Sequence, residues 1–187
     1  TTIASPKDAF ACGIGMIHQH FKLVDVLTAA ENIVLGLPGK LDLKAASAKI
    51  REICDKYGFS VDPTQKIYDM SVSQKQTVEI VKVLYRGADI LILDEPTAVL
   101  TPQETDKLFA VLRNMRNDGK AIVIITHKMH EVEALWRQGI GAIELCGAFG
   151  PDGARRIIEA TGNRIPVGYV THLPEQEAVY RAAFPND

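Results

Sequence analysis

The sequence predicts an α/β protein with three layers, in which a mostly parallel β-sheet has helices on both faces. Two runs, 90–93 and 121–125, contain only apolar residues. Uninterrupted apolar runs of this length are typical of strands that a parallel sheet buries on both faces. The segment 101–119 between them has the pattern of a helix. Strand, helix and strand in this order form a βαβ unit, whose crossover should be right-handed.

Composition limits the classes to which the chain can belong. It has 187 residues, of which 47% are hydrophobic and 24% charged, with a net charge of -2. These values are ordinary for a globular chain, and they give no positive field for nucleic acid, so we expect no nucleic-acid partner. The 3 cysteines are far apart, which fits a reducing, cytoplasmic setting better than a disulfide framework. We see no signal peptide or membrane span, and the start at Thr1 suggests a fragment or a processed chain.

Capping residues and apolar spacing define the elements of the first half of the chain. Helices are predicted where a capping residue precedes an apolar periodic run, at 5–13, 28–36, 42–58 and 71–87. Residues 15–21 have the pattern of a short strand that runs into a polar end. The helix at 101–119 has the clearest start, with a threonine cap, a proline and a glutamate in the first turn.

The C-terminal part has a second strand-helix-strand order. After a helix at 129–138, the sequence predicts strands at 141–146 and 166–171, a helix between them that stops at Gly162, and a last helix at 174–183. The glycine-rich turn 147–153 precedes Arg155 and Arg156. That turn is either an anion site at a helix N-terminus or an ordinary turn beside solvated arginines, and the second interpretation is favoured.

Two adjacent carboxylates follow the first apolar strand. Asp94 and Glu95 come directly after residues 90–93, and open α/β sheets bind their ligands at the carboxyl ends of their strands. The first acid can hold a magnesium ion and the second can polarise a water molecule. The alternative is a buried strand that ends in a solvated acidic turn.

Four motifs in order resemble those of a known family. From about residue 13 to 133, the chain is similar to the ATP-binding subunit of an ATP-binding cassette (ABC) importer of the sugar and nucleoside type. The motifs are the Q-loop segment at 15–21, the signature at 70–74, Walker B at 90–96 and the switch histidine segment at 126–128. The resemblance implies a fold derived from the P-loop NTPases, but lacking their first strand and P-loop.

The resemblance assigns roles to particular residues. Asp94 would hold Mg²⁺, with Gln19 at the same metal site, and Glu95 would be the base for the attacking water. His127 would reach the γ-phosphate of ATP, and Gln19 would couple the site to a membrane permease. At a helix N-terminus, backbone N–H groups would contact a phosphate held by a second subunit. The residues that carry these N–H groups are Ser71, Val72, Ser73 and Gln74. The natural parent would be a dimer on the cytoplasmic side of the inner membrane, beside its transmembrane permease.

The sequence departs from the family in two places. It contains no Gly-x-x-x-x-Gly-Lys-Ser/Thr, the loop that supplies an amide cradle and a lysine to the phosphates. Ser73 stands where the family usually has glycine, and Thr77 where it usually has arginine. These departures predict that ATP binding and ATPase activity (ATP and water to ADP and phosphate) are impaired in this chain alone.

Beyond about residue 135 the resemblance changes. Residues 139–184 are similar to a small uncharacterised bacterial α/β family, through the segment 143–150. We therefore expect two parts, 1–135 and a βαβ tail at 136–187 of different origin, packed on the same sheet. This suggests a chimera, either a fused gene or an engineered hybrid. Two alternatives to an ATPase stay open: a non-catalytic module that docks a permease through the helix around 43–57, and a scaffold without inherited function.

Overall fold

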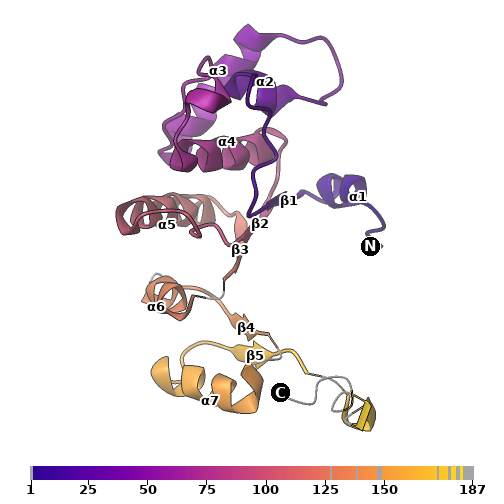
Figure 1. The fold of residues 1–187 in the computed structure, drawn as a ribbon, viewed down its shortest axis with the longest axis vertical. Coiled ribbons are helices and arrows are strands. Elements are labelled where there is room, and N and C mark those ends of the chain that lie inside the picture. Colours follow the sequence, from indigo (N-terminus) through magenta and orange to yellow (C-terminus); the bar gives the residue numbers. More distant parts are fainter. Residues whose placement is uncertain are drawn as a thin grey trace. The chain divides into compact units, whose positions relative to one another are not determined.

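The computed structural model describes residues 2–126, 128–137, 139–146, 149–171, 173–176, 178–179 and 182. The chain divides into two compact units, Thr1–Met129 and His130–Asp187. Figure 1 follows the elements along the chain, from the short helix α1 (Pro6–Ala11) onward.

The first unit is built on a three-stranded parallel sheet. Its strands are β1 (Ile14–Ile17), β2 (Ile90–Asp94) and β3 (Ala121–Ile125), in the order β1-β2-β3. Ile17 lies opposite Leu93, and Asp94 lies opposite Ile125. The carboxyl ends of all three strands therefore meet at one edge of the sheet. The predicted α/β class and parallel sheet are confirmed, as are the two strands that were expected from their apolar runs.

The two faces of this sheet differ in exposure. Ile17, Leu91 and Leu93 are buried on one face, on which α4 (Val72–Tyr85) contacts β1 and α5 (Pro102–Asn117) contacts β3. On the other face Met16, Val123 and Ile125 are 38–47% exposed. β1 is shorter than the sequence predicted. It ends at Ile17, because the polar residues that follow it leave the sheet in an exposed bend.

Helices form a second group in this unit. α2 (Ala29–Val34), α3 (Leu43–Tyr57), the 3₁₀ turn η1 (Ile67–Asp69) and α4 surround an apolar core. That core contains Ala29, Ala30, Ile33, Ile50, Cys54, Ile67, Met70, Val78 and Val81. α3 ends at Gly58, whose φ of 86° is the left-handed conformation that glycine adopts without strain. α2 and α3 are thus both packed against α4.

A polar contact joins α3 to the strand–helix layer. The hydroxyl of Tyr57 donates to Asp118 at 2.6 Å, and the ammonium group of Lys56 lies 2.7 Å from the same carboxylate. The side-chain amide of Asn114 donates to the carbonyl oxygen of Tyr57 at 3.1 Å. These contacts fix the C-terminal end of α3 against the C-terminal end of α5.

The second unit has the predicted strand-helix-strand order. It contains β4 (Ile143–Leu145), α7 (Gly150–Ala160), β5 (Val167–Tyr169) and the 3₁₀ turn η3 (Pro174–Gln176), and α6 (Met129–Arg137) leads into it. β4 and β5 pair in parallel in a sheet of their own, around a core of Ile143, Leu145, Ala154 and Ile165. The boundary at 135/136 and the packing of the tail on the first sheet stay predictions.

Bilayer-spanning helices are absent from the part of the chain that the structure describes, because no helix there is both long and apolar enough.

Candidate functional site

The paired acids lie at the carboxyl end of the central strand. Asp94 is the last residue of β2, and the backbone N–H of Glu95 donates to the carbonyl oxygen of Ile125 at 2.9 Å. Glu95 has a φ of 47°, which is uncommon for a residue other than glycine and is often found at functional sites. Its Oε2 atom is buried. The left-handed turn therefore directs the Glu95 side chain differently from the strand that precedes it.

The turn that begins at Glu95 is held from two sides. The buried side-chain amide of Gln76 on α4 donates to the carbonyl oxygen of Pro96, which is also buried. The ammonium group of Lys128 donates to the carbonyl oxygen of Thr97 at 3.0 Å. The sequence motifs assign no role to Gln76, and they include Lys128 only as part of the switch histidine segment at 126–128. A glutamine among the mostly apolar buried residues of α4 was the signal that could have indicated the first contact.

The segment after β3 reaches the same turn. The backbone N–H of Lys128 donates to the hydroxyl of Thr126 at 3.1 Å, so these two residues form a local bend. Through Lys128 this bend contacts Thr97, two residues after Glu95. His127 lies outside the described residues, and its predicted contact with the γ-phosphate of ATP stays a prediction.

Gln19 lies in the exposed bend that follows β1. Because β1 is parallel to β2 and Ile17 lies opposite Leu93, Gln19 is at the same edge of the sheet as Asp94. Three residues further along, the backbone N–H of Lys22 donates to the carboxylate of Glu79 on α4 at 2.7 Å. The structure thus brings the segments that carry Gln19 and the acid pair to one edge, both in contact with α4.

The predicted phosphate-contacting residues lie at the start of α4. Ser71 is the N-cap: its hydroxyl accepts from the backbone N–H of Gln74, and the Gln74 side chain accepts from the backbone N–H of Ser71 at 2.8 Å. Val72 and Ser73 occupy the first turn, where an α-helix supplies no carbonyl acceptor for the backbone N–H groups. The helix dipole adds partial positive charge at this end.

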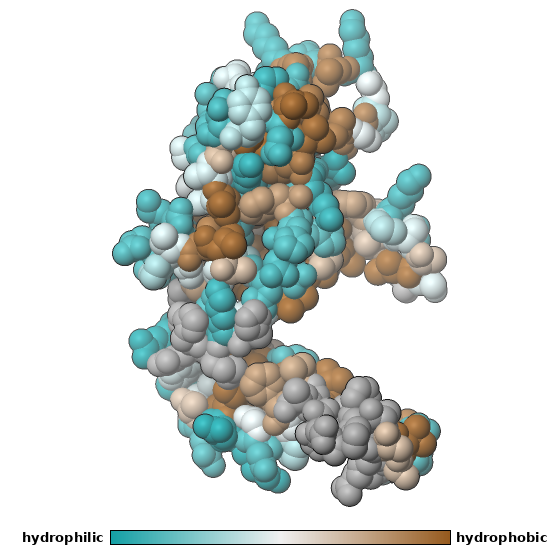
Figure 2. Space-filling model, in the orientation of Figure 1, coloured by the Kyte–Doolittle hydropathy of each residue, from teal (hydrophilic) through white to brown (hydrophobic). Residues whose placement is uncertain are grey.

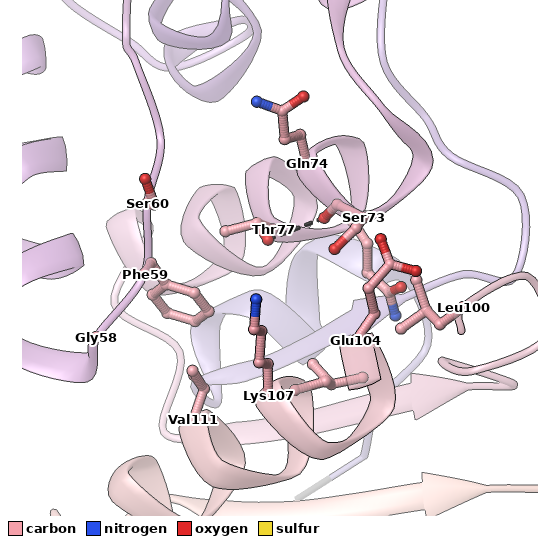
Figure 3. A pocket seen from close by; sticks show the side chains of 12 residues that line it. Gly58, Phe59, Ser60, Ser73, Gln74, Thr77, Leu100, Glu104, Lys107 and Val111 are labelled. Carbon is pink, nitrogen blue, oxygen red and sulfur yellow. Dashed lines mark hydrogen bonds between the residues drawn. The ribbon is translucent and has the colours of Figure 1, made fainter. Parts of the chain in front are cut away.

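A cavity of about 270 Å³ lies beside this helix start, between α4, α5 and the loop after α3 (Figure 3). Ser73, Thr77 and Glu104 line it, together with Lys107. The backbone N–H of Thr101 is the main cause that holds the pKa of Glu104 below its usual value, and a hydrogen bond from Ser73 adds to it. The Ser73 side chain lies beside Glu104 of α5 in this cavity.

The residues present fit a magnesium ion that is shared with a substrate. Among the residues that the structure describes, no group of three or more histidine, cysteine or acidic side chains could form an all-protein metal site. Mg²⁺ usually binds one or two carboxylates, keeps several waters and takes its remaining ligands from phosphates. The Asp94 carboxylate, partly exposed at the strand end, satisfies that requirement.

Two family models match parts of this chain. The family model described as "ABC transporter" matches residues 4–98, which is just over half of the chain. The chain belongs to the ABC transporter family. A second model, "Family of unknown function (DUF6506)", matches residues 118–184.

Two curated relatives of this ABC transporter chain are import ATP-binding proteins. The nucleoside import ATP-binding protein NupA of Lactococcus lactis subsp. cremoris is 55% identical over 137 residues, covering 71% of this chain and 27% of the relative. The glucose import ATP-binding protein TsgD13 of Haloferax volcanii is 44% identical, covering 70% and 30%. The chain thus spans less than a third of the length of these relatives.

Solved ABC transporter structures have the same fold. The dimeric structure of MJ0796, a bacterial ABC transporter cassette, matches with a TM-score of 0.52 at 26% identity, over 63% of this chain and 53% of that one. The cbiO1 protein of Clostridium perfringens, part of the ABC transporter complex cbiONQ, matches with a TM-score of 0.55 at 25% identity, over 67% and 52%. The predicted resemblance to the ABC family and the predicted fold class are confirmed.

Proposed function

We propose that residues 1–135 act in the ATP-binding subunit of an ABC importer for a sugar or nucleoside, on the cytoplasmic side of the inner membrane. One observation carries the proposal. Asp94 ends the central strand and Glu95 follows it, and the strands on both sides end at the same edge. The sequence has no glycine-rich phosphate loop. We therefore assign Asp94 to the metal ion and Glu95 to the attacking water. We expect this chain alone to bind ATP weakly.

The acid pair would divide the chemistry between its two carboxylates. Asp94 offers a hard oxygen ligand to Mg²⁺, either directly or through water. When bound, the ion neutralises charge on the β- and γ-phosphates of ATP. Glu95 would orient the attacking water and accept its proton. We assign His127 to the γ-phosphate and Gln19 to the metal site.

The start of α4 would serve a second subunit. The backbone N–H groups of Val72 and Ser73 stand in the first helical turn, where the helix dipole favours an anion. In a dimer, this end would contact the phosphate of an ATP molecule held by the partner.

A specific surface favours the second candidate function, a module that docks a permease. Four leucines of the connection between α2 and α3 are 37–63% exposed: Leu35, Leu37, Leu41 and Leu43. We call them the α2–α3 patch, and Figure 2 shows apolar residues at the surface over these helices. Exposed apolar patches are typical of interaction sites. The patch precedes and begins α3, the helix expected to dock.

The two candidates make different predictions. A docking module would co-purify with an importer's permease, and that association would be lost on Leu41→Asp combined with Gln19→Ala, without any need for nucleotide. If the tail at 136–187 makes the chain a chimera without inherited function, the protein folds but binds neither permease nor ATP.

The ATPase proposal is tested by Glu95→Gln, with Glu52→Gln on the exposed side of α3 as the matched control. ATP binding with Mg²⁺ and phosphate release are measured for each variant. Loss of the base should lower phosphate release by about a hundredfold or more, while ATP affinity stays within about twofold because the amide is isosteric. Measurable turnover that is equal in both variants would show that Glu95 is not the base.

A further inference from the structure

Two charged side chains of α4 hold the backbone of a single loop residue. Glu79 Oε1 accepts from the backbone N–H of Lys22 at 2.7 Å, and Lys82 Nζ donates to the carbonyl oxygen of Lys22 at 3.0 Å. Glu79 and Lys82 lie 3.8 Å apart and form an ion pair. Both backbone polar groups of Lys22 are therefore bound by one ion pair, three residues after Gln19.

The ion pair between Glu79 and Lys82 is largely buried. Glu79 is 5% exposed, and the Lys82 side chain is 16% exposed. Burial lowers the pKa of Lys82, while the Glu79 carboxylate raises it and Arg86 lowers it further. Charged groups are rarely buried unless they are paired or hydrogen-bonded. Besides pairing with each other, both charges here are hydrogen-bonded to the backbone of Lys22.

A second anchor holds the next stretch of the same loop. The side-chain oxygen of Asn32 accepts from the backbone N–H of Val24 at 2.7 Å, and its amide donates to the Val24 carbonyl at 3.1 Å. Asn32 is 1% exposed. The loop from β1 to α2 is thus fixed at Lys22 and Val24, and the span from β1 to Lys22 is the part that holds Gln19.

The same helix also holds the turn beside the acid pair. Gln76 lies one turn before Glu79 on α4, and its amide donates to the carbonyl oxygen of Pro96. Gln76 and Glu79 are both buried on one side of the helix. α4 therefore contacts the segments that follow β1 and β2, while its own first turn carries Ser71 to Gln74.

We propose that Glu79 and Lys82 are positioning residues that fix the Gln19 segment to α4. Through them, a displacement at the start of α4 reaches Gln19 and, through Gln76, the turn after Glu95. The link from nucleotide to Gln19 rests on the proposed function, whereas the anchor itself does not.

The anchor is tested by amide hydrogen exchange of the full chain, resolved by residue in NMR spectra. In Glu79→Ala, exchange of the Lys22 amide should become about ten- to a hundredfold faster, because a hydrogen bond to a charged group is lost. In Glu79→Gln the acceptor oxygen remains, so most of the protection should be kept. Amide exchange of residues 18–22 should be accelerated less in Lys82→Met than in Glu79→Ala. Glu52→Ala on the exposed side of α3 is the control.

The exchange data also separate positioning from general destabilisation. The amides of Ile80 and Val81 within α4 should keep their protection in every variant. Unchanged exchange at Lys22 in Glu79→Ala overturns the proposal, and so does equal acceleration at Lys22, Ile80 and Val81. Should Glu79→Ala fail to fold, Lys82→Met gives the decision, because unchanged exchange at residues 18–22 in that variant contradicts the anchor.

A nucleotide titration tests the link. With Mg²⁺ and ATP, the side-chain amide signal of Gln19 should shift in the wild type. In Glu79→Ala that shift should be lost, while ATP affinity stays within about twofold, since Glu79 contacts no phosphate in the proposed site. A retained shift overturns the coupling role. If ATP shifts no signal in the wild type, the proposed function fails and the anchor is judged by hydrogen exchange alone.

Discussion

The ammonium group of Lys128 donates to the carbonyl oxygen of Thr97 at 3.0 Å and lies 3.4 Å from the Thr97 hydroxyl. Thr97 is 2% exposed. The contact ties the segment after β3 to the turn that Glu95 begins, so two strand ends are joined by one side chain. Lys128 lies in the switch histidine segment at 126–128, whereas Thr97 lies just after the Walker B segment at 90–96.

Lys128→Met should therefore loosen this turn. The loss of a hydrogen bond from a charged group to a buried carbonyl should lower the free energy of unfolding by about 1–2 kcal/mol. Urea unfolding, followed by circular dichroism, measures it. Lys40→Met, at an exposed loop position, should change stability by less than about 0.5 kcal/mol. Equal stability of the two variants would mean that the Lys128 contact contributes nothing.

Gly15 of β1 lies against α4 with no room for a side chain. A methyl group there would overlap Val83, with Ala88 the next neighbour at 3.1 Å. Gly15→Ala should cost about 1–3 kcal/mol of stability through overpacking. The cost should shrink in a Val83→Ala background, where the overlapping methyl group is removed. Gly141→Ala is the control, since a Cβ at Gly141 meets open space. An equal cost in both backgrounds would contradict the overlap.

Acid should weaken the contact between α3 and α5. The pKa of Asp118 is lower than usual mainly because Lys56 donates a hydrogen bond to its carboxylate. The hydrogen bond from the Tyr57 hydroxyl lowers this pKa further. A carboxylate whose pKa is lowered by folding stabilises the protein above the pKa of the unfolded chain, near pH 4. That contribution disappears as the pH falls through the lower pKa of the folded state.

Melting temperatures between pH 6 and pH 2 test this sign. The difference between the wild type and Asp118→Asn should be constant above about pH 4 and should decrease below it. Asp106→Asn, exposed on the same helix, controls for the loss of a charge. A difference that grows as the pH falls would contradict the assignment.

Local signals in the sequence predicted the helix starts correctly. The pairs Thr28 and Glu31, Ser71 and Gln74, and Thr101 and Glu104 form capping boxes in the structure. Each box needs only residues three apart, so the sequence contains all of its information. The apolar strands β2 and β3 were predictable for the same reason, because burial on both faces leaves a continuous apolar run.

Long-range polar contacts could not be predicted in this way. Glu79 and Lys22 are 57 residues apart, and Gln76 and Pro96 are 20 apart. The sequence alone does not distinguish a buried glutamate on a helix from an exposed one, because the partner of the buried glutamate is distant along the chain. The end of β1 was misplaced because the polar residues 18–20 leave the sheet in an exposed bend before Lys22 meets α4. The acid pair was found from its strand, whereas its supports required the fold.

The most direct test of the account is the binding of a divalent cation together with ATP. Mn²⁺ replaces Mg²⁺ as a paramagnetic probe, and water-proton relaxation reports the bound Mn²⁺–ATP complex. Asp94→Asn removes the charge at the carboxyl end of β2, whereas Asp89→Asn removes one beside the amino end of the same strand. The account predicts affinity about tenfold lower for Asp94→Asn and unchanged for Asp89→Asn. Equal affinity of both variants and the wild type would contradict a metal site at Asp94, as would absence of binding in all three.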